Sequence, residues 1–234
     1  MLGERKQISH FVINFNKRTS YGFHAVVLNY FVDQVLAKSK DLKTTHIYFR
    51  LFRTGIIGDI LYKQGQKVIK GDENFAEEQF LASLFESYMF LARSIYDYLL
   101  HFLKQKYKIN DNSFHRFINK IKKEKYPEIE GKLRDHLKNS KIFEDTSDLR
   151  DSIKQKTSNI DVYVKNNKYW VSGTVYKRNG EKEKFDDSLY LKMFGYTTSL
   201  LLLMSYLAEN ITGISLKKQL KYQRNKDRGR LRSN

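Results

Sequence analysis

The sequence contains no cysteine and only one proline among its 234 residues. The lack of cysteine excludes disulfide bonds, thiolate zinc sites and thiol catalysis, and it argues against an extracellular disulfide-stabilised protein. Acidic residues are also scarce, with 26 Asp and Glu against 43 Lys and Arg, a formal net charge of +17. This excess favours a phosphate-rich partner such as nucleic acid, although an acidic protein partner or a generally basic proteome would give the same composition.

Several catalytic motifs are missing as well. The chain has no GxxxxGK[ST] phosphate loop, no GxGxxG dinucleotide motif, no HExxH zinc motif, no acidic calcium loop and no GxSxG nucleophile motif. The sequence therefore predicts neither a metal site nor a cofactor.

No long apolar run is free of polar residues. The N-terminal stretch MLGERKQISHFVINFNKR has charges on both sides of a short apolar run and no small-residue cleavage site, so a signal peptide is not expected. Residues 189–207 contain Lys192 and the polar group Thr197, Thr198 and Ser199, whereas a spanning helix needs about 20 mostly apolar residues. We expect a buried helix there, a cytoplasmic protein and no membrane partner.

Apolar residues recur every three or four positions over most of the chain, which is the spacing of amphipathic helices. The longest pattern predicts a helix over residues 75–107, with Asn74 as N-cap and Glu77 completing a capping box. Gly55 and Gly58 weaken a second helix at 45–64 by about 1 kcal/mol each relative to Ala, so part of it would also fit an extended segment. Further helices are predicted at 21–38, from the cap Ser113 through Ile121, from Pro127 to Asn139, and from Asp145 or Thr146 onward.

The period changes to two after residue 159. Ile160, Val162 and Val164 alternate with polar residues, Asn166 and Asn167 form a turn pattern, and residues 170–176 are rich in aromatic and β-branched side chains. An Asn-Gly pair at 179–180 predicts a second tight turn and a short third strand near Lys184 and Phe185. Asp186 or Asp187 would then cap the buried helix that follows.

These elements predict a mainly α-helical bundle with an inserted small antiparallel β-hairpin. Residues 1–73 form an N-terminal helical segment packing on the core, and residues 74–215 form the main domain with the hairpin near 160–185. Residues 216–234 hold eight Lys or Arg and one acid with few apolar residues, which is typical of a disordered basic tail.

The helix after residue 145 contains the stretch FEDTSDLRDSIKQKT. Together with the helix order, this stretch resembles the HEPN superfamily (higher eukaryotes and prokaryotes nucleotide-binding domains) over residues 75–210. The resemblance implies an Arg that holds a scissile phosphate, a polar residue, and a His four to six residues after the Arg that moves protons. In active members it implies metal-independent RNA cleavage at a site often shared across a homodimer. By this match Arg150 takes the Arg position and Asp151 the polar position.

The position of the histidine is occupied by Gln155, and the next two residues are Lys156 and Thr157. An amide does not titrate near neutral pH, so it cannot replace a histidine in acid–base catalysis, but it can donate and accept hydrogen bonds. The degenerate motif of Arg150, Asp151 and Gln155 therefore predicts binding of RNA or a nucleotide, with a ribonuclease site that is absent or impaired.

Three alternatives stay open. A histidine from elsewhere, such as His101, His115 or His136, would restore an endoribonuclease, or the chain would use Lys154 or Lys156 as a purely electrostatic helper. Arg150 and Asp151 also fit an ordinary surface ion pair. A protein-interaction or antitoxin-like scaffold in a defence system, with a partner protein, fits the same sequence.

Basic clusters give the expected nucleic-acid contacts. The run HRFINKIKKEKY at 115–126 interleaves cations with apolar residues at helical spacing, as an ordinary exposed lysine-rich helix also does. Contacts to phosphates from the tail would be independent of base sequence, and a solvated tail without a partner is the alternative. The residues predicted to bind nucleic acid are Lys154, Lys156, Lys217, Lys218, Lys221, Arg224, Arg228 and Arg230.

Overall fold

The computed structural model describes residues 74–139, 141–155, 159–177 and 179–215, together with single positions at 31, 34, 50, 51, 53–58, 60, 61, 64, 217, 218 and 221. The chain divides into two compact units, Thr45–Leu200 on the one hand and Met1–Thr44 with Leu201–Asn234 on the other. The helix that follows the sheet crosses the boundary at Leu200, so it contributes one half to each unit.

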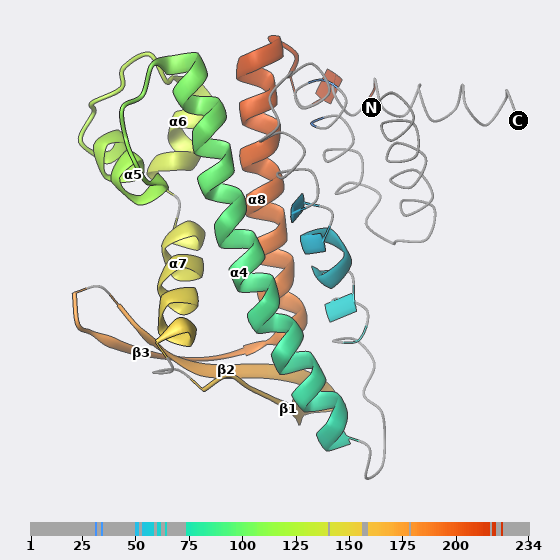
Figure 1. Ribbon diagram of the computed structural model, residues 1–234. Helices are drawn as coiled ribbons and strands as arrows, with labels where there is room; N and C mark the ends of the chain where they lie inside the picture. The colour runs from blue at the N-terminus through green and yellow to red at the C-terminus, as the bar shows by residue number, and fades with distance from the viewer. Residues whose placement is uncertain are drawn as a thin grey trace, which may run out of the picture. The chain divides into compact units, whose positions relative to one another are not determined.

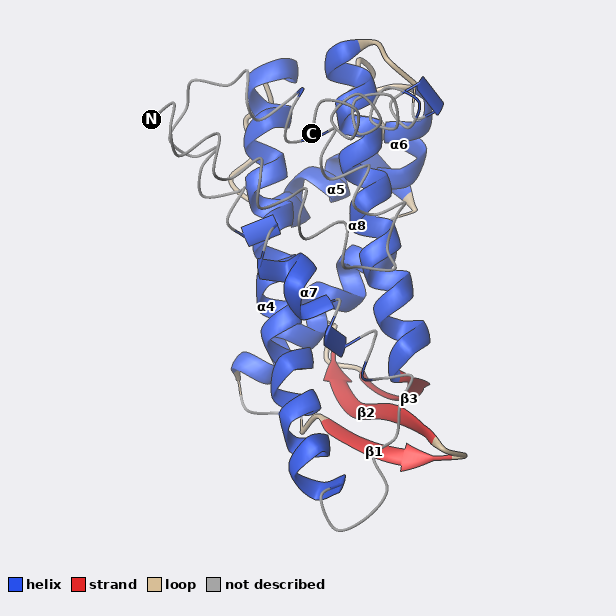
Figure 2. Ribbon diagram, turned by 90° about the vertical axis from the view of Figure 1, so that its right-hand side faces the viewer, coloured by secondary structure: helices blue, strands red, loops and turns tan. Residues whose placement is uncertain are grey.

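The described fold is mainly helical with a small antiparallel sheet, which confirms the predicted fold class. In the larger unit the long helix α4 runs from the sheet to the pair α5 and α6, and α7 lies between that pair and the sheet (Figures 1 and 2). The elements in chain order are α4 (Asn74–Tyr107), α5 (Phe114–Lys122), α6 (Gly131–Lys138), α7 (Lys141–Lys154), β1 (Asp161–Lys165), β2 (Lys168–Tyr176), β3 (Lys182–Ser188) and α8 (Leu189–Thr212).

The core of the larger unit is built around α4, whose predicted bounds are confirmed to within one residue. Its buried face packs against α7 and β1. The hydroxyl of the fully buried Tyr88 lies 2.8 Å from Thr197 Oγ1 on α8, so the one polar atom of this side chain is satisfied. The core cluster consists of Leu61, Leu81, Ala82, Phe85, Tyr88, Met89, Ala92, Leu149, Ile160, Val162, Tyr169, Val171, Leu189, Met193 and Tyr196.

A second apolar cluster lies where α4, α5 and α7 meet. The Phe143 ring packs against Tyr96 and Phe114, with ring centroids 5.0 and 4.8 Å apart. The predicted N-cap of α5 is confirmed, because the hydroxyl of Ser113 accepts a hydrogen bond from the Arg116 N–H at 3.3 Å.

Two predicted helix starts were wrong. Pro127 lies in a turn, and α6 begins at Gly131, because Arg134 donates to the carbonyls of Tyr126 and Ile129 at 2.6 and 3.1 Å and holds the preceding chain out of the helix. Helix α7 begins at Lys141 rather than at 145 or 146, since burial of Phe143 extends its apolar face by one turn.

The sheet is a three-stranded meander in the order β1-β2-β3. The predicted turn is confirmed, with φ of 53° at Asn166 and 57° at Asn167, the positive values that a two-residue hairpin of type I′ requires. The third strand predicted near Lys184 and Phe185 is β3, which pairs with β2 and ends at Ser188. Asp186 and Asp187 belong to this strand, so the prediction that one of them caps the next helix was wrong.

Gly173 interrupts an otherwise aromatic and β-branched strand for a steric reason. A Cβ atom at this position would lie 2.8 Å from Phe185 Cε1 and 2.9 Å from Ile160 Cδ1. Phe185 is the register partner of Gly173, so its ring covers the space that a side chain would occupy.

Positions at both ends of the chain are described only in part. The described residues between 50 and 64 are helical, including Gly55 and Gly58, which favours the helix over the extended alternative at those positions. The helix predicted at 21–38 lies outside the described residues, apart from Phe31 and Gln34. No helix among the described residues is both long and apolar enough to cross a membrane.

Candidate functional site

Helix α7 holds the motif residues against the rest of the larger unit through two buried serines. Ser152 Oγ donates to the Asp148 carbonyl at 2.8 Å and accepts from the N–H of Tyr176 on β2, also at 2.8 Å. Ser147 Oγ accepts from Nε of the buried Arg93 at 3.2 Å. These contacts fix the C-terminal half of α7 beside the sheet.

Arg150 and Asp151 form an ion pair within α7. The Nη2 atom of Arg150 lies 2.8 Å from Asp151 Oδ1, and the two side chains are 25% and 31% exposed. The next two motif residues, Lys154 and Gln155, are exposed at the end of the helix. The ion-paired Arg150, the lysine Lys154 and the amide of Gln155 therefore lie within the last two turns of α7 and the residue that follows it. Lys156 lies outside the described residues.

Three histidines of the sequence analysis are described, and none has the position of the missing acid–base group. His115 lies on α5, with Nε2 3.1 Å from Asn119 Nδ2, and His136 lies on α6, with Nε2 3.5 Å from Ser199 Oγ. Burial lowers the pKa of His136, which favours its neutral form. Both helices lie at the end of α4 remote from the sheet, and His101 belongs to the last two turns of α4 (Figure 1).

Much of the positive charge predicted for the run 115–126 is compensated. Lys120 Nζ lies 2.6 Å from the buried carboxylate of Asp111, and that hydrogen bond raises the pKa of the lysine. Lys122 pairs with Glu144. The other basic residues of this run lie away from the Arg150 end of α7, because α5 lies at the opposite end of α4 (Figure 2).

The tail residues predicted to bind nucleic acid are described only in part. Lys217, Lys218 and Lys221 are helical and exposed, although the sequence predicts disorder there. Arg224, Arg228 and Arg230 lie outside the described residues.

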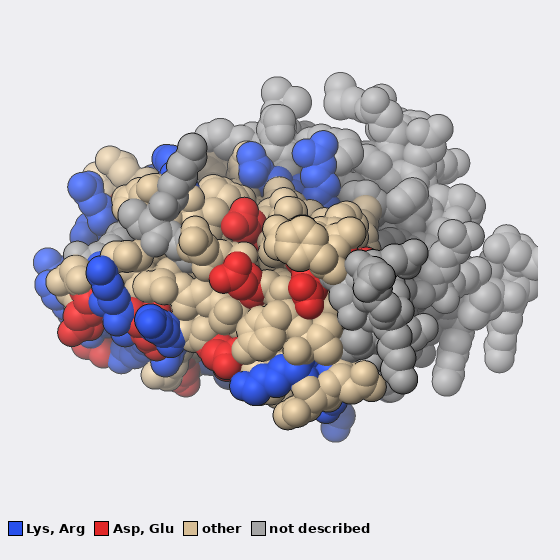
Figure 3. Space-filling model, turned by 90° about the horizontal axis from the view of Figure 1, so that it is seen from below, with Lys and Arg blue, Asp and Glu red and all other residues tan. Residues whose placement is uncertain are grey.

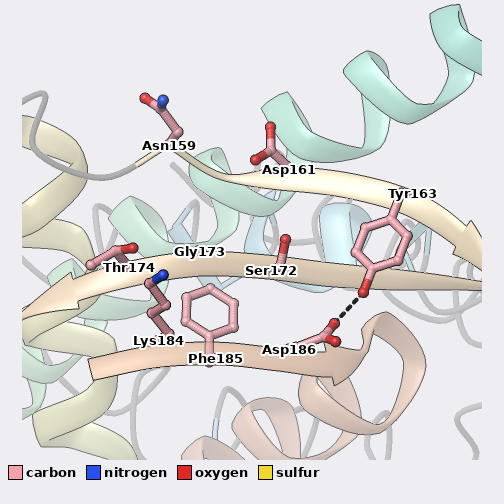
Figure 4. Close-up of a pocket in the computed structure, with 9 residues that line it drawn as sticks. All are labelled: Asn159, Asp161, Tyr163, Ser172, Gly173, Thr174, Lys184, Phe185 and Asp186. Atoms are coloured by element: carbon pink, nitrogen blue, oxygen red, sulfur yellow. Dashed lines mark hydrogen bonds between the residues drawn. The ribbon is translucent and has the colours of Figure 1, made fainter. Parts of the chain in front are cut away.

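Sequence reasoning missed the outer face of the sheet, the side turned away from α7. Tyr163 on β1 and Trp170 on β2 are register partners and therefore lie side by side on this face, and Tyr176 follows on β2. Beside Tyr163 the sheet carries a shallow hollow of about 720 Å³ (Figure 4). Its lining consists of Asn159, Asp161, Tyr163, Ser172, Gly173, Thr174, Lys184, Phe185 and Asp186.

The position of the Tyr163 ring is fixed by a hydrogen bond across the sheet. Its hydroxyl donates to Asp186 Oδ1 on β3, so the side chain reaches over β2, which lies between the two strands (Figure 4). Lys165 Nζ lies 3.3 Å from the other oxygen of Asp186. The Tyr163 hydroxyl and then Lys165 lower the pKa of Asp186, while the same hydrogen bond raises the pKa of Tyr163.

Each of the other two rings has a lysine over it. Lys165 Nζ lies 4.3 Å from the ring centroid of Trp170, and Lys182 Nζ lies 5.1 Å from that of Tyr176, both within cation–π range. Seen from the sheet side, acidic side chains lie towards the middle of the face and most Lys and Arg towards its edges (Figure 3). The face therefore combines aromatic rings with lysines that lie over them.

A signal for this face exists in the sequence. Within each strand the residues of the outer face occupy every second position, with Tyr163 on β1, Trp170 on β2 and Lys184 on β3, while the aromatic Tyr169 and Phe185 have the opposite parity and face the core. Val162, Val164 and Val171 identify the buried face. The residues that alternate with them along each strand therefore belong to the outer face. Only the register shows that the aromatic residues of different strands are neighbours.

We expect Tyr163→Phe to raise the pKa of Asp186 towards its ordinary value. The hydroxyl that stabilises the carboxylate is then absent, while the ring remains in place. Because the pKa of Asp186 is lowered in the folded state, the stability from this contact is present above the ordinary carboxyl pKa and is lost as the pH falls through the folded value. A carboxyl-carbon NMR titration extended below about pH 4 measures the shift. Tyr176→Phe is the matched control, and an unchanged Asp186 titration in Tyr163→Phe would contradict the assigned hydrogen bond.

No family model, curated protein or solved structure matches the chain. The resemblance to the HEPN superfamily thus depends on the Arg150 motif and on the order of the helices.

Proposed function

We propose that this protein is an HEPN-like protein that binds RNA or a nucleotide without cleaving it. The proposal is carried by one observation on α7: Arg150 is paired with Asp151, and the exposed Gln155 occupies the position of the acid–base histidine. The net charge of +17 supports an anionic ligand.

The chemistry of RNA cleavage explains why this arrangement favours binding over turnover. Without a metal, the attacking and leaving oxygens need a group that accepts and returns a proton, and such a group contributes typically about 10²- to 10⁴-fold to the rate. Glutamine does not transfer protons near neutral pH. Asp151 also competes with a phosphate for the Arg150 guanidinium, so a phosphate contact at this position would be weakened rather than absent.

The proposal is tested by incubating the full chain with a labelled single-stranded RNA in the presence of a chelator and following both anisotropy and cleavage. We expect binding at low salt and intact RNA. Arg150→Ala should weaken binding about two- to fivefold, and Asp151→Asn, which frees the guanidinium, should strengthen it by a similar factor.

Lys138→Ala is the matched control, because Lys138 is also an ion-paired cation but lies on α6, at the other end of α4. It should leave the affinity unchanged. Absence of binding at low salt would refute the proposal. Metal-free cleavage that Arg150→Ala abolishes would replace it with the endoribonuclease alternative, in which a histidine from elsewhere supplies the proton.

A second candidate is a protein-interaction role, which is favoured by the exposed aromatic side chains of α4. Phe75 is 70% and Phe80 50% exposed, and the partly exposed Phe90 borders an apolar hollow with Ile56 and Ile57. A homodimer or a partner protein from a defence system would cover such surface. Light scattering on the purified chain measures its molar mass and so tests for a homodimer. If the chain is a dimer, Phe80→Glu should reduce the measured mass to that of the monomer.

A further inference from the structure

We propose that the outer face of the sheet stacks the unpaired bases of single-stranded RNA. This inference rests on the proposed RNA binding and gives it a second site, separate from Arg150. The stacking face is defined by Tyr163, Trp170 and Tyr176 with the lysines Lys165, Lys182 and Lys184. The buried core is made by the opposite side of the strands, so packing of the core does not require this composition.

The spacing of the rings fits an extended strand of nucleotides. Tyr163 and Trp170 are adjacent through the register, and Tyr176 lies six residues from Trp170 along β2, a span of about 20 Å. Small polar residues, Ser172 and Thr174, occupy the positions between the two ends on the same side of β2. The hollow over them leaves room for bases between the outer rings (Figure 4).

Tyr163 is positioned before any ligand binds. Its hydroxyl is tied to Asp186 across β2, so the ring lies over the strand instead of rotating freely in solvent. A ring fixed in this way loses little conformational entropy when a base stacks on it. Base–aromatic stacking accepts every base, because every base has a π face.

The charges of the face match a nucleotide chain rather than a phosphate alone. Lysines lie at its edges, where they can meet phosphates, and Lys165 covers Trp170 until a base takes its place on the ring. The carboxylate of the exposed Asp161 and the hydroxyls of Ser172 and Thr174 line the hollow. The carboxylate repels phosphate, whereas the carboxylate and the hydroxyls can accept hydrogen bonds from base edges and from the ribose 2′-hydroxyl, which favours RNA over DNA.

Unpaired bases are required, because the rings contact base faces. In a duplex those faces are covered by neighbouring base pairs, and the sheet would meet only the sugar–phosphate surface. A duplex of equal charge therefore controls for purely electrostatic binding to the lysines and the basic tail.

The single tryptophan of the chain, Trp170, gives a direct readout. With the full-length protein and a short unlabelled oligouridine at low salt, we expect the tryptophan fluorescence to be quenched in step with binding measured by anisotropy of a labelled copy. A matched RNA duplex should bind without this quenching. The corresponding oligodeoxyribonucleotide should bind more weakly, and equal binding would overturn the ribose contact assigned to Asp161.

Single substitutions separate the stacking face from other sites. Tyr163→Ala should weaken oligouridine binding about 5- to 150-fold, whereas Tyr163→Phe, which keeps the ring, should retain most of the affinity. Phe194→Ala is the matched control, because Phe194 is 45% exposed but lies on α8. The control should bind like the unchanged protein.

The outcomes distinguish this inference from the proposed function. Oligouridine binding without tryptophan quenching, and with unchanged affinity in Tyr163→Ala, would overturn the stacking face while leaving RNA binding intact. Absence of any binding at low salt would overturn both. Because the fluorescence measurement uses the unmodified protein, it decides the question even if Tyr163→Ala does not fold.

Discussion

Phe143→Ala should lower the free energy of unfolding by about 3–5 kcal/mol, the largest effect on stability that we expect from a single substitution. Phe143 is fully buried, and its ring contacts Tyr96, Phe114 and the guanidinium of Arg93, whose Cζ lies 5.0 Å from the ring centroid. Truncation removes this packing and leaves a cavity between α4, α5 and α7. It also exposes one side of a buried arginine whose polar contacts include Ser147 and Asp97.

Urea denaturation followed by far-UV circular dichroism measures this change. Phe143→Leu refills part of the cavity and should lose less than half as much stability. Phe75→Ala is the control for removal of a phenyl ring, because Phe75 is 70% exposed, and it should change stability by about 0.5 kcal/mol or less. An equal effect of Phe143→Ala and Phe75→Ala would contradict the buried aromatic cluster.

RNA affinity should fall steeply with salt, and removal of residues 217–234 should reduce that dependence. For single strands, each neutralised phosphate contributes about −0.7 to the slope of log affinity against log salt. If four of the eight basic tail residues make contacts, affinity drops about 50-fold between 50 and 200 mM salt, and with all eight about 2,000-fold.

Anisotropy titrations of the full and shortened chains over that salt range give both slopes. Equal slopes would show that the tail makes no phosphate contacts. If the stacking face also binds, the shortened chain should retain a weaker affinity with a smaller salt dependence, because stacking itself releases no counterions and only the remaining phosphate contacts do. The two contributions can therefore be separated on the same protein.

The small polar residues of α7 have structural contacts that do not require catalysis. Ser152 joins the helix to Tyr176 on β2, and Ser147 satisfies Arg93 on α4. These contacts stabilise α7 whether or not the residue at position 155 can transfer protons.

Elements whose signal is local could be predicted from the sequence. The apolar repeat of α4, the Ser113 cap and the positive φ values at Asn166 and Asn167 depend on residues close together in the chain, so their positions were predicted correctly. The buried face of the sheet follows from the alternation of Val162, Val164 and Val171 for the same reason.

Elements whose bounds depend on side-chain contacts and strand pairing could not be predicted. Helix α6 begins after Pro127 because Arg134 binds the turn carbonyls, α7 begins early because Phe143 is needed in an aromatic cluster, and Asp186 lies in a strand because β3 pairs with β2 up to Ser188. The candidate sites divide in the same way. The sequence by itself determined the Arg150 motif and its missing histidine, since these are neighbours on one helix. Only the tertiary structure placed Asp186 beside Tyr163, because the pairing of β3 with β2 joins residues that are distant in the chain.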